Sequence, residues 1–340
     1  METLWFIFLT VLLTVYVVLD GYDLGAGAAH IFVAKTEAER QTVFRTIGPF
    51  WDGNEVFLLA AGGTMFAAFP SAYAASFSGF YLPLMFVLWL LIFRGIAIEL
   101  RSHMDNPLWK QLWDVAFFSA SALLAIFFGA ALGNVIRGVP LDDKGEFFLS
   151  LWTHFGVQGE VGILDWYTIL VALLALAALV MHGCFWIVLK ASGELAGRAR
   201  QLAFRAGVAT AVLTIPVTAA TFWVQPQIAN NLKQHSWGAG FPLLALIGLA
   251  GALLLRRDEL KAFLSSSLYL AGMMCSGAFG VFPYVLPSTR GNGMTATSAA
   301  AGAYGLTGAL VWWIPGMLLT TGYFVCVYRH FRGKVTAQLH

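Results

Sequence analysis

Acidic residues and one arginine interrupt the apolar stretches in the first hundred residues of the chain. Asp52 and Glu55 stand three residues apart at the start of one stretch, so a helix would place both on one face. Asp20 and Asp23 repeat this spacing near the end of an earlier stretch. Carboxylates suit proton transfer, because burial and neighbouring charges move their pKa in either direction. The pattern indicates a proton route in which Arg94 holds one carboxylate ionised.

A simpler interpretation is also open for these groups. They could be interfacial charges, solvated or paired, that only fix the topology of the chain. Asp52 and Glu55 could also just favour a helix N-terminus, where negative charge is stabilising. Ionisable residues inside a membrane are rare and usually functional, which favours the proton route.

The composition identifies the solvent in which these residues must be held. Of the 340 residues, 59% are hydrophobic and 11% are charged, and the mean hydropathy is +0.74. A soluble domain carries about 25% charged residues. The sequence therefore predicts an all-α integral membrane protein surrounded by lipid. The net charge of +2 comes from dispersed Lys and Arg, so no nucleic acid partner is expected.

Apolar runs of about 20 residues, each long enough to cross a bilayer, predict nine transmembrane helices. An amphipathic segment with a capping-box pattern at Thr36 to Glu39 predicts a short surface helix over 36–46. Asn106 followed by Pro107 similarly predicts a cap and the first position of a helix. We expect a first four-helix bundle over 1–136, which contains the charged cluster. An outside loop over 137–161, a second four-helix bundle over 162–284, and a loop, ninth helix and tail over 285–340 follow. The predicted spans are 4–25, 50–70, 76–98, 114–136, 162–189, 203–224, 239–255, 262–284 and 304–328.

Most of the 20 Lys and Arg residues fall in alternate loops, which predicts the orientation of the chain. By the positive-inside rule, the N-terminus lies outside and the C-terminus is cytoplasmic. Asp20 and Asp23 then stand at the cytoplasmic end of the first span, and Asp52 and Glu55 at the start of the second. Arg94 lies in the last turns of the third span, with Glu99 just beyond. These groups are expected to meet at one depth near the inner boundary.

Cysteine and histidine give little support for a metal site in this chain. The three cysteines lie inside apolar stretches and form no CxxC pair. His182 is the one histidine deep in a predicted span, and a haem held by two histidines would need a second. Packing or a hydrogen bond to a neighbouring helix is the favoured role for His182 over haem ligation.

Several motifs together resemble subunit II of the cytochrome bd-type quinol oxidases. They are LDGYDLGAG at 19–27, TIGPFWDGNEVFLLAAGG at 46–63, FAAFPSAYAASFSGFY at 66–81 and FRGIAIELR at 93–101. The resemblance continues more weakly with NPLWKQLWD at 106–114, GNVIRGVP at 133–140 and FPYVLPS at 282–288. One departure is Phe57, which stands where the family often has Trp.

The resemblance implies a bacterial or archaeal cytoplasmic-membrane complex that oxidises quinol and reduces dioxygen to water. The b and d haems and the quinol site would belong to a partner, subunit I, and this subunit would bind no haem. Its fold would be two four-helix bundles plus one additional helix. Some members hold a structural quinone, and whether small accessory subunits join stays open. The family's acidic residue in W-D-x-N-x-V, here Asp52, is implicated in cytoplasmic proton delivery, and Asp20, Asp23, Glu55, Arg94 and Glu99 would support it.

Two other classes of function stay open on the residues alone. A proton-coupled secondary transporter could use Asp20, Asp52 and Arg94 to couple substrate movement to protons. Broken helices and an inverted repeat near the midplane would favour that class, whereas a cluster at one boundary favours the oxidase. A membrane scaffold with inert charges is the third possibility.

Overall fold

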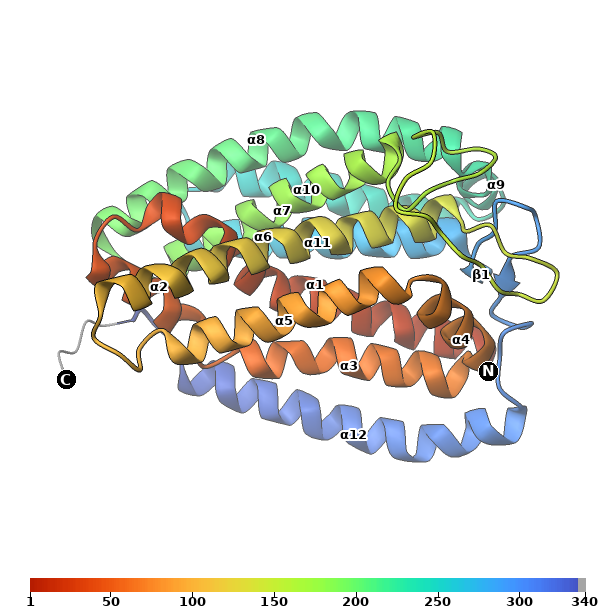
Figure 1. The fold of residues 1–340 in the computed structure, drawn as a ribbon, viewed down its shortest axis with the longest axis horizontal. Coiled ribbons are helices and arrows are strands. Elements are labelled where there is room, and N and C mark those ends of the chain that lie inside the picture. The colour runs from red at the N-terminus through yellow and green to blue at the C-terminus, as the bar shows by residue number, and fades with distance from the viewer. Residues whose placement is uncertain (336–340) are drawn as a thin grey trace.

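The computed structural model describes residues 1–335 and is built almost entirely of long helices that run side by side (Figure 1). The predicted all-α class is confirmed. In chain order the elements are α1 (Glu2–Val33), α2 (Glu37–Ile47), α3 (Trp51–Ala68), α4 (Pro70–Gly79), α5 (Tyr81–Leu100), α6 (Pro107–Arg137), α7 (Trp166–Lys190), α8 (Gly193–Val224), α9 (Pro226–Gln234), a 3-10 turn (Ser236–Ala239), α10 (Gly240–Leu254), α11 (Glu259–Val281), β1 (Tyr284–Leu286), β2 (Met294–Thr295) and α12 (Ala303–His330).

Eight helical stretches in the described part of the chain are long and apolar enough to cross a membrane. The ninth expected span forms α3, which is 18 residues long and carries Asp52, Asn54 and Glu55 in its first turns. Because of these polar residues, α3 is not among the eight stretches that are apolar enough by this measure. Figure 1 nevertheless shows α3 lying alongside α12, and α3 also packs on α1. The count of nine spans stays a prediction, as does the division into two four-helix bundles.

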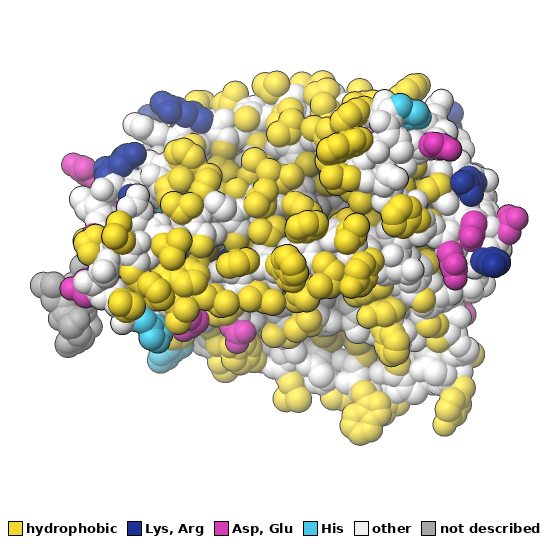
Figure 2. All heavy atoms as spheres, in the orientation of Figure 1, with side chains coloured by type: hydrophobic (Ala, Val, Ile, Leu, Met, Phe, Trp, Pro, Cys, Tyr) yellow, Lys and Arg dark blue, Asp and Glu magenta, His cyan; other side chains and the backbone are white. Residues whose placement is uncertain are grey.

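The loops lie at the two ends of the molecule, as the sequence predicts. The N-terminus and the end of α12 lie at opposite ends of the helix array (Figure 1). Figure 2 shows hydrophobic side chains over the middle of the visible face and charged side chains gathered towards its two ends. An apolar belt between two charged rims is the surface that a bilayer requires.

Helix α1 is the structural centre, because it packs against α3, α6 and α7. Its contact with α7 is very close. A Cβ added to Gly25 would overlap the carbonyl oxygen of Leu179, and one added to Gly183 would overlap the backbone of Ala26. Small residues at such crossings let two backbones approach, which is how helices gain packing energy in lipid.

Helix α1 does not end at residue 25, where the sequence predicts the end of the first span. Helix α1 continues to Val33, and its last third is buried beneath neighbouring helices rather than exposed to solvent. Val33 is 13 residues beyond Asp20, which is about 20 Å along the helix axis. Asp20 therefore lies in the middle of α1 and not at its end. The hydropathy of the sequence falls after residue 25, but packing against protein allows the helix to continue.

Several local predictions are confirmed. Thr36 caps α2, its side chain accepting from Glu39 N while the Glu39 carboxylate accepts from Thr36 N, so the capping box is complete. Asn106 caps α6, with Pro107 at its first position. The loop over 225–238 contains the unpredicted α9, and the loop over 285–303 contains the antiparallel pair β1 and β2.

Candidate functional site

A buried ion-pair cluster joins α1, α3 and α5. The Arg94 guanidinium on α5 is fully buried, and its Nη1 lies 2.7 Å from Asp20 Oδ1 on α1. Its Nη2 binds Glu55 Oε1 on α3. Asp20 is also fully buried, whereas the Glu55 side chain is 23% exposed. Arg94 thus bridges one carboxylate sealed in the protein and one that reaches its surface.

A separate hydrogen-bond network holds Asp23, which stands one helical turn from Asp20 on α1. The side-chain amide of Asn54 donates to Asp23 Oδ2 at 2.7 Å and to the Tyr22 hydroxyl at 2.8 Å. The Tyr22 hydroxyl lies 2.6 Å from that of Tyr328 on α12. Within residues 1–335, Asp23 Oδ1 is buried without a hydrogen-bond partner. One carboxylate oxygen therefore stays available to accept a proton.

Helix geometry explains why these groups meet. Asp20 and Asp23 are three residues apart on α1, so they share a face that looks towards α3 and α5. Helix α3 begins at Trp51, which places Asn54 and Glu55 in its first two turns. Arg94 lies six residues before the end of α5. All these helices are strongly apolar, so the charged side chains turn inward where partners are available.

The predicted site residues divide into two groups. Asp20, Asp23, Glu55 and Arg94 come together as the sequence predicts. Asp52 and Glu99 are exposed in this chain, near the ends of α3 and α5 that face the cytoplasm in the predicted orientation. Asp52 is one helical turn from Glu55, so it remains close to the cluster without being buried in it.

Sequence reasoning missed part of this network. Tyr22 was visible between the two aspartates, but its hydroxyl could not be placed without the fold. Tyr328 gives no local signal, because it lies more than 300 residues from Tyr22. The structure shows that Asn54 is a hydrogen-bonding partner rather than packing alone.

A second polar network closes the end of the molecule where α2 lies. Asp114 on α6 accepts from Arg101 Nε at 2.6 Å and from Arg40 Nη1 at 2.8 Å. Arg101 also donates to both oxygens of Glu37, at 3.0 and 2.9 Å. Although burial opposes its charged form, the hydrogen bonds to Asp114 and Glu37 raise the pKa of Arg101. The network ties α2 to α5 and α6.

Histidine side chains are the remaining possible ligands for a metal or haem. His182 on α7 has both ring nitrogens engaged, Nδ1 with Ser266 Oγ at 2.7 Å and Nε2 with the Val18 carbonyl at 2.9 Å. The hydrogen bond to a neighbouring helix that the sequence favours for His182 is therefore present. No group of three His, Cys, Asp or Glu side chains in residues 1–335 is arranged to hold a metal ion.

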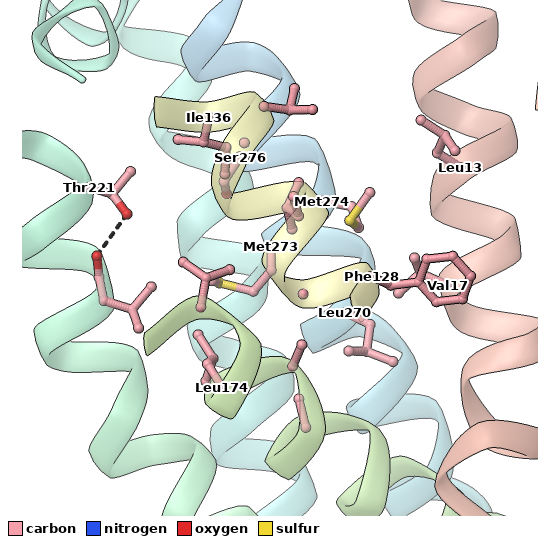
Figure 3. Close-up of a pocket in the computed structure, with 18 of the residues that line it drawn as sticks. Leu13, Val17, Phe128, Ile136, Leu174, Thr221, Leu270, Met273, Met274 and Ser276 are labelled. Atoms are coloured by element: carbon pink, nitrogen blue, oxygen red, sulfur yellow. Dashed lines mark hydrogen bonds between the residues drawn. The ribbon is translucent and has the colours of Figure 1, made fainter. Parts of the chain in front are cut away.

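An apolar cavity of about 460 Å³ lies among α1, α6, α7, α8 and α11 (Figure 3). Leu13, Phe128, Met273 and Met274 are among the side chains that line it. Polar groups in the wall are few and mostly paired, as with the Tyr167 and Thr221 hydroxyls, which lie 2.9 Å apart. A cavity of this size and character suits an apolar ligand.

Comparisons with known proteins agree over nearly the whole chain. A family model described as cytochrome bd terminal oxidase subunit II matches residues 1–331. The probable cytochrome oxidase subunit 2 of Haemophilus influenzae is 30% identical, covering 98% of this chain and 95% of its own length. The cytochrome bd-I ubiquinol oxidase subunit 2 of Escherichia coli K12 matches with the same identity and coverage.

The fold has a match among solved structures. A chain of the bd oxidase from Geobacillus thermodenitrificans superposes with a TM-score of 0.74, covering 97% of this chain and 98% of that chain. Its sequence identity is 17%, so the likeness bears on the fold alone.

Proposed function

The chain belongs to the cytochrome bd terminal oxidase subunit II family, and from this premise we propose that its buried charged cluster delivers protons to a haem-bearing partner subunit. The complex is a membrane quinol oxidase that reduces dioxygen to water. Water formation consumes protons, so the reaction needs a protonic path through a region that lipid and protein otherwise seal. This chain supplies that path and supports the partner, subunit I.

The proposal rests on one observation, which is that carboxylates outnumber arginines in the cluster. Asp20 and Glu55 both pair with the single guanidinium of Arg94, and Asp23 stands one helical turn from Asp20 on α1. Unpaired charge is costly in a medium of low dielectric, so the cluster favours holding protons on its surplus carboxyls. A proton that leaves one side can be replaced from the other while Arg94 keeps the net charge small.

Exposure decreases along the cluster in the direction that a proton would travel. Asp52 is exposed, Glu55 is 23% exposed one turn further along α3, and Asp20 is fully buried. Glu99 is exposed at the end of α5 on the same side. We assign Asp52 and Glu99 to proton collection at the membrane boundary, and Glu55, Asp20 and Asp23 to transfer inwards.

The direction of transfer follows from the loop charges. One end of the molecule carries α2, the α7–α8 turn and the α10–α11 turn, and it holds most of the Lys and Arg residues. By the positive-inside rule, this end faces the cytoplasm. The N-terminus then lies outside, in a bacterial inner membrane. Protons enter from the cytoplasm, and quinol oxidation outside releases others, which builds a gradient.

The haems and the quinol site are assigned to subunit I. His182, the only histidine deep in a predicted span, has both ring nitrogens in hydrogen bonds to Ser266 and Val18, which leaves neither free for iron. The apolar cavity fits a structural quinone, whose isoprenoid tail would lie against Leu13, Phe128 and Met273. Extraction of the purified complex with organic solvent should recover quinone in excess of the catalytic site, and the bulkier Ala178→Phe should reduce that excess.

The proton role is tested by Asp20→Asn and Glu55→Gln in the purified two-subunit complex. Both should slow oxygen consumption and proton uptake from the cytoplasmic side, while the optical haem spectrum stays unchanged. Glu194→Gln, which replaces an exposed carboxylate at the start of α8, is the matched control. Wild-type rates in both cluster variants would show that the charges are structural.

A further inference from the structure

The face of α1 that carries the aspartates continues towards the cytoplasmic end with two more residues. Tyr16, Asp20, Asp23, Gly27 and His30 follow one another at steps of four, three, four and three, so they form one stripe along the helix. His30 lies about 10 Å beyond Asp23 along the axis. The cluster described above uses only the first part of this stripe.

A polar hollow of about 570 Å³ opens near the His30 end of the stripe. Asp114 and Arg40 are in its wall, and they also belong to the ionic network of Arg101 and Glu37. Asp114 in the wall of the hollow is also the carboxylate that faces His30. Its lining residues are Lys35, Glu37, Arg40, Asp105, Pro107, Lys110, Gln111 and Asp114.

His30, the last residue of the stripe, is fully buried. Its Nδ1 lies 2.7 Å from the Gly27 carbonyl, and a carbonyl only accepts, so Nδ1 carries a hydrogen. Its Nε2 lies 3.7 Å from Asp114 Oδ1 and has no hydrogen-bond partner among the described residues. An imidazole nitrogen next to a carboxylate, with no other partner, is placed to take up a proton.

Ser121 on α6 lies against the stripe at Gly27, which stands between Asp23 and His30 on α1. A Cβ added to Gly27 would overlap Ser121 Oγ, so the hydroxyl lies directly against the stripe at the Gly27 level. This hydroxyl is buried and lacks a hydrogen-bond partner in the part of the chain that the structure describes. Asp23 Oδ1 is similarly unpartnered. Buried polar groups are rarely left unsatisfied, and such exceptions often mark a functional role or an ordered water.

We infer that His30 and Ser121 form a second proton route, which leads from the polar hollow to Asp23 and is separate from the one that begins at Asp52. The inference rests on the proposed function, because both routes end at the same cluster. Three buried groups with unused hydrogen-bonding capacity follow one helix face, and a charged hollow lies at one end of it.

The proton balance along the route is simple. His30 Nε2 takes one proton from water in the hollow and becomes an imidazolium, which the ionised Asp114 stabilises. The imidazolium then gives the proton on Nε2 to a water or to the Ser121 hydroxyl. The Ser121 hydroxyl gives its own hydrogen to Asp23. One proton moves from the hollow to Asp23, and His30 and Ser121 return to their starting forms.

Asp114, which faces His30, and the charged groups paired with it come from α6, α2 and the segment after α5. Asp114 faces His30 from α6, and Arg40 and Glu37 of α2 and Arg101 after α5 surround that carboxylate. Two arginines keep Asp114 ionised, so it attracts a proton to His30 without itself becoming the carrier. Phe117 packs on the imidazole, with ring centroids 5.2 Å apart.

The test uses the complete oxidase with His30→Asn, which keeps a donor near the Gly27 carbonyl but cannot titrate, and Ser121→Ala. Each is made alone and in an Asp52→Asn background, where the other intake is removed. Proton uptake is measured with a pH indicator after mixing the reduced enzyme with dioxygen. His182→Asn, which removes a buried imidazole off the stripe, is the control.

We expect a small effect of each variant alone and a loss of about 100-fold in uptake rate in the Asp52→Asn background, the low end of a proton-transfer group's contribution. The double variant His30→Asn with Ser121→Ala should take up protons no more slowly than either single variant, because both residues lie on one route. Unchanged uptake in the Asp52→Asn background would overturn the route. If Asp20→Asn also left uptake unchanged, the proposed function itself would fail, and the two failures are therefore distinguishable.

Discussion

Replacing Arg94 with glutamine is the most direct test of the electrostatics of the cluster. The variant removes the only guanidinium between Asp20 and Glu55 and leaves a neutral amide in its place. Breaking a buried ion pair by removing one partner costs about 3–5 kcal/mol, since the other charge stays buried without compensation. Glu55 is partly exposed and water can solvate it, so most of the cost falls on Asp20. We therefore expect a loss near the lower limit, about 3 kcal/mol.

The loss can be measured as the free energy of unfolding of the purified complex in mixed micelles. Denaturing detergent is increased stepwise, and tryptophan fluorescence follows the transition. Arg257→Gln, an exposed position on the turn between α10 and α11, is the matched control and should change stability by less than about 0.5 kcal/mol. The double variant Arg94→Gln with Asp20→Asn removes the stranded carboxylate as well. It should be more stable than Arg94→Gln alone.

The comparison between the single and double variants decides the argument. Groups in contact show coupling energies of about 0.5–3 kcal/mol in such cycles, whereas independent groups add. If the losses of Arg94→Gln and Asp20→Asn simply sum, the 2.7 Å contact carries no pairing energy. A stable, fully active Arg94→Gln variant would also refute the view that this cation organises the cluster.

Two further predictions concern the scaffold. Burial opposes ionisation of Glu39, but hydrogen bonds from the backbone of Lys35 and Thr36 and from Arg198 lower its pKa below the ordinary 4.5. Its contribution of about 1 kcal/mol to capping α2 should be complete above pH 4.5 and disappear as the pH falls through the lowered value, so Glu39→Gln and the wild type should converge in thermal stability at acid pH. Gly183→Ala should strongly destabilise the α1–α7 contact, whereas Gly197→Ala on α8, where a Cβ meets open space, should be neutral or slightly stabilising in the same melting assay.

The sequence predicts those features that local chemistry determines. The Thr36 capping box and the Asn106 cap are short-range hydrogen-bond patterns, and both are present. The meeting of Asp20, Glu55 and Arg94 follows from the depth of each residue in its span, because buried charges must find partners at their own level.

Features that depend on the rotation of a helix about its axis could not be predicted. Helices that are apolar on all sides give no periodic signal for which face turns inward. Asp52 and Glu99 were expected near the cluster, and only the packing of α3 and α5 shows that both side chains are exposed. The continuation of α1 to Val33 was missed for a related reason, since protein and not lipid surrounds its last turns.

The close contact of α1 with α7 and the polar stripe on α1 constrain each other. Gly25 and Gly183 fix the rotation of α1, because no other residue type fits where the two backbones meet. With that side fixed, Asp20, Asp23 and His30 must point towards α3, α5 and α6, where Glu55, Arg94 and Asp114 are found. A rotation of α1 by one residue, about 100°, would break every pair at once. The glycines are thus as necessary to the proposed proton route as the carboxylates, although they carry no charge.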